Sequence, residues 1–587
     1  MSDEVLRIAN CSGFYGDRLS AAREMVHGGP IDVLTGDYLA ELTMMILFKD
    51  RTKNPEAGFA RTFLRQMEEV LSTCIARHIK VVVNAGGLNP AGLATELRKL
   101  ADRLGVSARI AHIEGDDLLA RIPALQAEGV DLQHLDTGQP LAALQAQVVT
   151  ANAYLGGWGI VEALQRGADV VVCPRVTDAA LVIGPAAWKF GWKRDDWDRL
   201  AAAVVAGHII ECGAQCTGGN YSFFREVPNI DRIGFPIAEM SADGSFVITK
   251  HPDTGGLVSI GTVTAQLLYE IQGARYLNPD ATARFDSIHL EQQGPDRVRV
   301  SGIKGEPAPP TTKVCINYLG GYKNGMTFVL AGLDIEAKAR LAEDTLWQLV
   351  GGKERFAETS VRLVRSERSN PASNEDAFAY LHVVVKDPDA TKVGRAFSNK
   401  VVEMALANYP GFFITSPPGD ASPFGVYWPA LVPSEHVEHK VVIGDEKVVI
   451  PTVPVPTRNF EASVPAVSIP KPPDGPTEYA PLGSICGARS GDKGGNANVG
   501  LWVRDATAYA WLESYLTVEE LKRLVPEAAA LRVERSTLPN ISSLNFIVYG
   551  LLGDGVAAST RSDPQAKSFG EYVRAKVVTI PRALLAR

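Results

Sequence analysis

The chain has 587 residues, of which 46% are hydrophobic and 21% are charged, and its formal net charge at pH 7 is -8. A chain of this length needs more than one hydrophobic core, and its composition is that of a globular protein. The acidic balance argues against a protein that binds nucleic acid, because such proteins usually carry a basic excess.

The cysteine and hydropathy patterns exclude two further classes. The seven cysteines are widely spaced and odd in number, which favours reduced thiols in a cytoplasmic protein. The first residues, MSDEVLRIANC, lack the basic and apolar regions of a signal peptide. No run of about 18 or more apolar residues is present, so we expect neither a membrane-spanning helix nor a membrane partner.

The first part of the chain, about 1–225, alternates predicted strands with predicted helices. Apolar strands are expected at 5–10, 31–36, 79–87, 108–115 and 169–176. Segments with helical periodicity lie between them, at 19–28, 59–77, 94–105 and 159–168. Continuous apolar strands that alternate with amphipathic helices are typical of an α/β fold in which a mostly parallel, Rossmann-like sheet is covered on both faces.

The rest of the chain divides into three segments that differ in composition and in predicted secondary structure. Residues 226–450 mix turn-bounded strands with helices and predict an α+β extension, so that 1–450 forms one N-terminal region. Within it, the aromatic loop at 416–429 is expected to be a lid, an interface or a structural wrap. Residues 451–481 are rich in proline and indicate a semi-rigid linker. Residues 482–587 predict a small α+β domain.

Glycines and polar residues follow the predicted strands of the first part. In a parallel sheet, ligands bind at the carboxyl ends of the strands. Glycine turns there can present backbone N–H groups to an anion, although no complete nucleotide-binding fingerprint occurs. The alternative is a set of ordinary turns whose acidic residues cap helices. The candidate catalytic residue here is Asp178, and the candidate substrate-binding residues are Gly13, Asp37, Asn84, Gly86, Gly87 and Arg175.

A second cluster lies in GHIIECGAQCTGGN, residues 207–220. His208 and Glu211 are three residues apart, share a helix face and suit general acid–base catalysis. Gln215 and Thr217, in the glycine-rich turn that follows, are candidate substrate-binding residues. The two cysteines of the segment lack a second ligand pair, so no metal site is predicted. The alternative is a capped helix end that leads into a glycine turn.

The stretch GARSGDKGGNANVG, residues 487–500, predicts a tight turn at 491–495 before a strand. Its basic side chains suit a phosphate or a carboxylate. We interpret it as an anion-binding loop that closes over the rim of the first domain. The alternative is a turn with an interdomain or intersubunit salt bridge. The candidate substrate-binding residues here are Arg489, Asp492, Lys493 and Asn496.

Seven segments resemble one known family. They are IANCSGFYGDR (8–18), VLTGDYLAELTM (33–44), VVNAGGLNP (82–90), ANAYLGGWGIVEAL (151–164), ADVVVCPRVTDAAL (168–181), GHIIECGAQCTGG (207–219) and ARSGDKGGNANVG (488–500). With them the chain resembles the acyclic terpene utilisation (AtuA-like) family, formerly a domain of unknown function, over essentially its whole length. The resemblance implies a C-terminal AtuA-like ferredoxin-fold domain. It also implies a role in the catabolism of acyclic terpenes such as citronellol and geraniol, and of related branched acids, through acyl-CoA thioesters.

From these residues and the resemblance we expect an enzyme that acts on a branched acyl-CoA or carboxylate by hydratase, lyase or isomerase chemistry. Its acid–base candidates are Asp178, His208 and Glu211. A CoA thioester is expected as a substrate, no redox cofactor is needed, and the chain is expected to form a homo-oligomer. One alternative is a non-catalytic binding or scaffold protein of a terpene-degradation complex. The other, a nucleotide-dependent oxidoreductase, lacks a glycine fingerprint with an acidic ribose partner.

Overall fold

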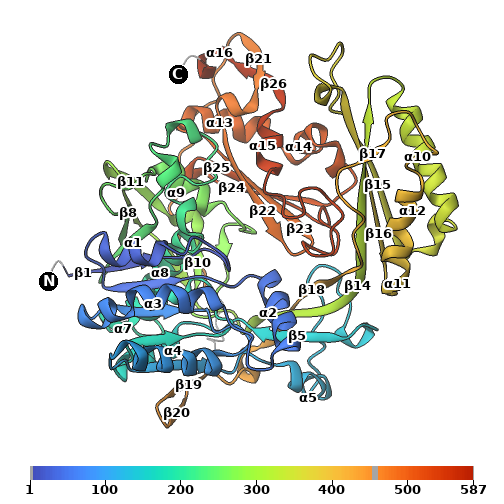
Figure 1. Cartoon of the computed structure of the whole chain (residues 1–587). Helices are drawn as coiled ribbons and strands as arrows, with labels where there is room; N and C mark the ends of the chain where they lie inside the picture. The colour runs from blue at the N-terminus through green and yellow to red at the C-terminus, as the bar shows by residue number, and fades with distance from the viewer. Residues whose placement is uncertain (1–3, 453–459, 586–587) are drawn as a thin grey trace.

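The computed structural model describes residues 4–452 and 460–585. Figure 1 shows an N-terminal body built on a large sheet, a lobe of strands and helices at the right, and a C-terminal module drawn in orange and red. The C-terminal module lies over the body and beside the lobe, so that segments far apart in the sequence meet beneath it.

The body is built on an 11-stranded sheet in the order β11-β12-β8-β7-β1-β2-β3-β6-β4-β19-β20. Its five central strands are parallel and come from the predicted apolar segments. They are β1 (Val5–Asn10), β2 (Val33–Gly36), β3 (Lys80–Val83), β6 (Val170–Val172) and β4 (Ile110–Glu114). Consecutive residues such as Val81, Val82 and Val83 are all fully buried, because helices cover both faces.

The prediction of a mostly parallel sheet is wrong, because the sheet is mixed. Antiparallel strands extend both sides of the parallel centre. On the β1 side these are β7 (Pro236–Ser241), β8 (Phe246–Lys250), β12 (Arg297–Ser301) and β11 (His289–Gly294), and on the β4 side β19 (Lys440–Ile443) and β20 (Glu446–Val449). These strands lie far along the chain and join the sheet through hairpins, which need no crossover helix.

Two helical layers sandwich the sheet. One face is covered by α1 (Ala21–His27), α3 (Arg61–Ala76) and α4 (Pro90–Leu104). The other is covered by α6 (Trp158–Gln165), α7 (Ala180–Phe190) and α8 (Trp197–Ile210). In α4 the local sequence sets both ends: the Asn89 side chain accepts the Gly92 N–H at 2.9 Å, and Gly105 ends the helix at φ +67°. Successive side chains of a strand point to opposite faces of the sheet, so the apolar side chains on each face pack against one of the two helical layers.

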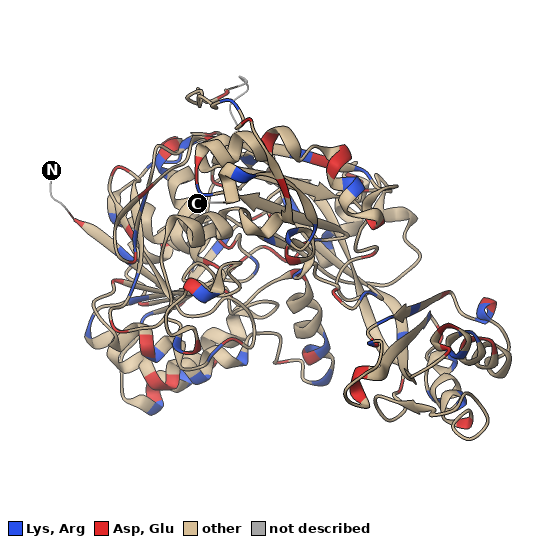
Figure 2. Cartoon of the chain, turned by 90° about the horizontal axis from the view of Figure 1, so that it is seen from above, with Lys and Arg blue, Asp and Glu red and all other residues tan. Residues whose placement is uncertain are grey.

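A second, six-stranded sheet is organised around the 21-residue strand β14 (Thr311–Ala331). Its first half pairs with β5 (Val148–Ala153) and β18 (Ser422–Pro433), and its second half with β16 (Phe378–Asp387) and β17 (Phe413–Ile414), while β15 (Glu358–Val364) forms the edge. Helices α10 (Ile335–Val350) and α12 (Arg395–Glu403) pack on the second half and form the lobe that projects in Figure 2. Most of the loop expected at 416–429 is instead strand β18, whose aromatic side chains pack in a sheet.

Shorter elements complete the N-terminal region. A three-stranded sheet beside α8 consists of β13 (Lys304–Glu306), β10 (Thr282–Arg284) and β9 (Arg275–Tyr276). The remaining helices are α2 (Glu41–Lys53), α5 (Ile122–Ala127), α9 (Ile260–Leu267) and α11 (Ala390–Val393). Of these, α2 follows β2 and packs against β5, β14 and β18, so it links the two large sheets.

The C-terminal module has its own core and an antiparallel sheet in the order β22-β23-β25-β24. The strands are β22 (Gly487–Lys493), β23 (Asn496–Trp502), β25 (Ser543–Val548) and β24 (Val533–Leu538), and a separate pair joins β21 (Thr477–Pro481) to β26 (Val577–Pro581). The helices are α13 (Ala506–Tyr515), α14 (Val518–Leu524), α15 (Phe569–Arg574) and α16 (Arg582–Leu585).

The tight turn expected at 491–495 is shorter than predicted. Lys493 pairs with Asn496, so only Gly494 and Gly495 connect β22 to β23 in a hairpin, and Gly494 has a φ of +63°. Asp492 and Lys493 are therefore strand residues, and their side chains point to opposite faces of the hairpin. The five glycines of residues 487–500 hid the strand, because glycine is unfavourable in strand interiors.

Part of the proline-rich linker expected at 451–481, residues 453–459, lies outside the described residues. Residues 460–476 contain neither helix nor strand, and they run along the body: the Ala462 N–H donates to Glu306, and the Phe460 ring lies 5.0 Å from that of Trp197. Strands from both sides of residue 225 share the large sheet. The predicted division of the N-terminal region at about residue 225 stays a prediction.

In the described part of the chain, no helix is long and apolar enough to span a bilayer. Lys and Arg alternate with Asp and Glu around the body and the lobe in Figure 2, and no single basic face stands out.

Candidate active site

A cavity of about 960 Å³ lies where the body, the long strand β14 and the C-terminal module meet. Its volume is suited to a drug-sized ligand or larger. Residues that follow β2 and β6 line it from the body, β14 and β18 line another wall, and the β22–β23 hairpin closes it. The cavity thus lies at the carboxyl ends of the parallel strands, the position expected for a ligand. Because the closing hairpin belongs to the same chain, a single chain builds the whole cavity.

The cavity brings together ten of the residues singled out in the sequence. These are Gly13, Asp37, Arg175, Asp178, His208, Glu211, Gln215, Arg489, Asp492 and Lys493. The other five, Asn84, Gly86, Gly87, Thr217 and Asn496, are absent from its lining. The sequence therefore located the site, while the role of each residue stays a prediction.

The glycine turns do not offer free N–H groups to an anion. The Gly13 N–H donates to Asp17 at 2.8 Å, and the Gly86 N–H donates to the Cys173 carbonyl at 3.0 Å. The Gly87 N–H donates to the Asn84 carbonyl at 3.3 Å. These glycines allow close packing instead: a Cβ on Gly86 would lie 2.6 Å from the Cys173 carbonyl oxygen.

Asn84, Thr217 and Asn496 hold neighbouring segments in place. Asn84 donates its amide to Asp37 at 2.6 Å, and burial, followed by the charge of Asp178, raises the pKa of Asp37 well above its usual range. The Thr217 hydroxyl donates to a backbone carbonyl at 2.6 Å. The Asn496 side-chain amide donates a hydrogen bond to the Asp136 carboxylate at 2.9 Å, and this bond joins the hairpin to the body.

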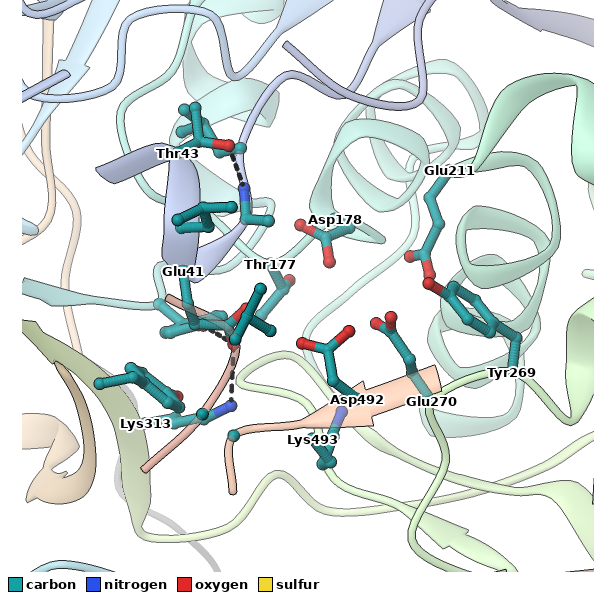
Figure 3. A pocket seen from close by; sticks show the side chains of 18 of the residues that line it. Glu41, Thr43, Thr177, Asp178, Glu211, Tyr269, Glu270, Lys313, Asp492 and Lys493 are labelled. Atoms are coloured by element: carbon teal, nitrogen blue, oxygen red, sulfur yellow. Dashed lines mark hydrogen bonds and ion pairs between the residues drawn. The ribbon is translucent and has the colours of Figure 1, made fainter. Parts of the chain in front are cut away.

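Four carboxyl groups converge on the cavity. Figure 3 shows the side chains of Asp178, Glu211, Glu270 and Asp492 directed into the same space, from the loop after β6, the end of α8, the loop after α9 and strand β22. Burial, and then the charge of Asp178, raises the pKa of Glu211 well above its usual range. Burial therefore favours the protonated form of Glu211, the form that can donate a proton.

Arg175 holds Asp178 in a charged pair. The Arg175 side chain is 3% exposed, and its Nη1 lies 2.8 Å from an Asp178 oxygen. The guanidinium also lies 4.1 Å above the ring of Tyr154, which orients it. Arg175 thus fixes the position of the Asp178 carboxyl group in the cavity that Glu211 also lines.

His208 lies behind Glu211. Its Nδ1 is 3.2 Å from a Glu211 oxygen, and its ring packs 5.1 Å from that of Tyr276 and 5.6 Å from that of Phe285. Burial, and then the charge of Lys493, lowers the pKa of His208 to about 4, so the imidazole is neutral at pH 7. The shared helix face predicted this pair correctly, and the geometry makes His208 a support for Glu211.

The C-terminal module fixes the loop that carries Glu270. Glu270 has a φ of +57°, an uncommon conformation for a residue other than glycine, and its N–H donates to the Asn498 side chain at 2.8 Å. The neighbouring ring of Tyr269 lies 4.3 Å from the Arg489 guanidinium and 4.5 Å from the Lys567 ammonium. Contacts between the C-terminal module and the body therefore orient the Glu270 carboxyl group in the cavity.

Sequence reasoning missed a second group of cavity residues. Glu41 accepts a hydrogen bond from the Tyr154 hydroxyl at 2.9 Å and lies 3.5 Å from Lys313. Burial opposes ionisation of Glu41, but Lys313 and Arg175 together lower its pKa to about 2. Glu41 is the first residue of α2, four residues after Asp37, so a search extended past the turn would have found it. Lys313 is the third residue of β14 and has no local signal.

Within residues 4–452 and 460–585, no group of three or more His, Cys, Asp or Glu side chains is placed to hold a metal ion. Burial, and then the charge of Glu211, raises the pKa of the Cys212 thiol well above its usual range. Burial likewise raises the pKa of Cys216. Both thiols are therefore poor nucleophiles, because the thiolate is the reactive form.

The buried carboxyl of Asp492 makes the stability of the protein depend on pH. Burial, and then the charge of Glu270, raises its pKa from 3.8 to about 8. The folded state therefore holds this proton more tightly than the unfolded state, and stability falls as the pH rises from about 4 to about 8. We expect Asp492→Asn to be more stable than the wild type at pH 8, by at least about 1.4 kcal/mol, the equivalent of one pKa unit. Thermal unfolding across this range measures the difference, and a difference that is independent of pH would contradict the assignment.

Two family models match the chain. Residues 6–443 match the family model described as acyclic terpene utilisation family protein AtuA, and residues 480–579 match the AtuA ferredoxin-like domain. None of the curated proteins compared with the chain matches it. A solved structure of homoserine dehydrogenase from S. aureus is 9% identical and covers 70% of this chain and 84% of its own, with a TM-score of 0.12, which is too low to compare the folds. Because the first model spans most of the sequence, the chain belongs to the acyclic terpene utilisation family and carries that family's ferredoxin-like domain at 480–579.

Proposed function

We propose that the protein is an enzyme that transfers protons beside the carbonyl carbon of a branched acid or its CoA thioester. The observation that carries the proposal is that Asp178, which pairs with Arg175 at 2.8 Å, and Glu211, whose pKa burial raises, line one cavity. Two carboxyl groups in such different surroundings are suited to act together as a base and an acid, the roles that we propose for Asp178 and Glu211.

The pair supports hydratase, lyase or isomerase chemistry. In a dehydration, Asp178 takes a proton from the carbon next to the carbonyl, and the electrons of the broken C–H bond form a carbon–carbon double bond. The hydroxyl group on the next carbon leaves with the proton of Glu211 as water. Hydration is the reverse of this step. In an isomerisation, a proton is removed from one carbon and another is returned elsewhere along the same chain. His208 stays neutral and orients Glu211 throughout.

The cavity also has walls suited to an apolar chain. Six of its large apolar side chains are more than a third exposed: Phe14, Leu42, Ile46, Leu135, Leu277 and Leu431. Exposed apolar surface in a concave site is stabilised when a ligand covers it. These residues favour a branched hydrocarbon substrate, in keeping with a family named for acyclic terpenes.

Basic residues of the C-terminal module line the same cavity and suit the phosphates of CoA. They are Arg489, Lys493, Arg532 and Lys567. In this proposal the thioester end of the substrate lies beneath the β22–β23 hairpin and the hydrocarbon lies along α2. A cytoplasmic location and a homo-oligomeric state are part of the same proposal and rest on the sequence.

Deuterium exchange tests this proposal without knowledge of the final product. The purified protein is incubated in D₂O with geranyl-CoA or citronellyl-CoA, and the thioester is analysed by mass spectrometry. We expect deuterium to enter the acyl chain faster than in protein-free buffer, because every reaction of this class either removes a proton from the carbon beside the carbonyl or adds one to it. Exchange no faster than the background with both thioesters and with their free acids would contradict the proposal.

A further inference from the structure

The cavity has a second end, formed by β14, β18 and the start of α2, which the proton-transfer residues do not occupy. The Lys313 ammonium lies there, 5.1 Å from the ring centre of Tyr154 and 5.4 Å from that of Tyr427. It also lies 3.5 Å from a Glu41 oxygen, an interaction drawn in Figure 3. Two aromatic rings and a carboxylate therefore hold one ammonium group at a defined place in the cavity.

Two buried hydrogen-bond donors at this end have no partner among the described residues. One is the hydroxyl of Tyr427, and the other is Nε of Arg175. Both side chains line the cavity. Leaving a buried donor without a partner costs free energy, so such donors are explained when a ligand supplies the acceptor.

Cationic side chains gather at this end. Arg175, Lys313 and Lys493 act electrostatically on Glu41, and the Lys313 ammonium lies 3.5 Å from a Glu41 oxygen. Burial lowers the pKa of Lys313, so an anion placed beside its ammonium group relieves an unfavourable desolvation.

The C-terminal hairpin covers this end. A Cβ on Gly494, at the hairpin turn, would lie 3.3 Å from the ring of Tyr427, so the turn packs directly against it. Lys493, the preceding residue, acts electrostatically on both Glu41 and Lys313. The hairpin thus encloses the unpartnered donors and keeps water from competing for them.

We infer that Lys313 and Tyr427, with Arg175, bind the carboxylate or thioester carbonyl oxygen of the substrate, and that Glu41 positions Lys313. The inference rests on the proposed function and adds to it a set of hydrogen-bond donors that bind the carbonyl oxygen. When Asp178 removes a proton beside the carbonyl, the electron pair moves onto the carbonyl oxygen, and Lys313 and Tyr427 stabilise the charge that develops there. A substrate with no oxygen at this position has no partner for these donors.

Binding measurements with two matched probes test the inference. The probes are citronellate and citronellol, which share a carbon skeleton and differ in the head group. Calorimetric titration is performed on the full chain with Lys313→Met and Tyr427→Phe. The surface variant Lys447→Met is the control, because Lys447 forms an exposed pair with Glu114 far from the cavity lining.

We expect citronellate to bind the wild type more tightly than citronellol. Lys313→Met weakens citronellate binding by roughly tenfold to a hundredfold, and Tyr427→Phe by about threefold to tenfold, as expected for lost bonds to a charged group. In the same two variants, the affinity for citronellol changes by less than about twofold. Lys313→Arg, which restores the charge, recovers part of the citronellate affinity.

Three outcomes would overturn the inference. They are no citronellate binding by the wild type, unchanged citronellate affinity in both variants, and equal losses for the acid and the alcohol. These results are separable from the proposed function, because Glu211→Gln leaves citronellate affinity within about threefold of the wild type while it suppresses proton transfer. Deuterium exchange by a wild type whose Lys313 and Tyr427 variants bind citronellate normally would keep the function and discard the oxyanion site.

Discussion

Glu211→Gln is expected to lower the rate of deuterium incorporation into geranyl-CoA by about a hundredfold to ten-thousandfold, the range attributed to a lost general acid. The substitution keeps the size of the side chain but removes the acidic proton, whose binding to Glu211 is favoured by burial and then by the charge of Asp178. The wild-type rate should also fall as the pH rises past the pKa of Glu211, because the acid form is then lost. Asp178→Asn removes the proton acceptor and should cause a loss of similar size.

The control for this experiment is Glu226→Gln, which removes an exposed ion pair with Arg504 outside the cavity lining. It should exchange deuterium at the wild-type rate. Thermal shifts with geranyl-CoA should show that Glu211→Gln still binds the thioester, so that the loss is in the chemical step. Wild-type exchange rates in both Glu211→Gln and Asp178→Asn would remove the observation on which the function rests.

Gly491→Ala is expected to lower the free energy of unfolding by about 1–3 kcal/mol and to impair exchange, because it overpacks the joint between the C-terminal module and the body. A Cβ on Gly491 would lie 2.5 Å from a ring carbon of Tyr269 and 3.1 Å from Cγ of Glu270. The Tyr269 ring cannot easily move, since Arg489 and Lys567 both pack on it. The hairpin must therefore shift, and Asp492 and Lys493 shift with it.

Gly294→Ala is the matched control, because a Cβ there meets no atom within 4 Å. It should leave both thermal stability and exchange close to the wild type. If Gly491→Ala matches this control in stability and in exchange, then the close packing of β22 on the Tyr269 loop is not what holds the cavity closed.

The sequence predicted the centre of the fold and ten residues that the fold brings into one cavity. Strands such as Val81–Val83 are continuous apolar runs, and only a sheet covered on both faces accommodates them. Local spacing also placed His208 and Glu211 together, and their atoms lie 3.2 Å apart. The acidic and glycine-rich strand ends predicted where the cavity lies, because parallel strands bring their carboxyl ends to one edge.

Other features depended on contacts that no local pattern records. The β22–β23 hairpin was taken for a glycine loop, and its strand pairing depends on partners in β25, about fifty residues later. Lys313 and Tyr427 belong to strands whose residues alternate toward the cavity only because β14 pairs with β18. The antiparallel edges of the large sheet likewise come from distant hairpins.

By itself, the sequence determined the family, the parallel centre of the sheet and the contact between His208 and Glu211, since each of these follows from a pattern within a short segment. Only the tertiary structure decided which groups carry charge and what surrounds the ligand. Burial and neighbouring charges, supplied by segments hundreds of residues apart, raise the pKa of Glu211 and hold Arg175 and Lys313 beside Glu41. Protonation depends on the environment that the folded chain creates around each group. The pKa values of the cavity residues are therefore set only when the body, strand β14 and the C-terminal module pack together.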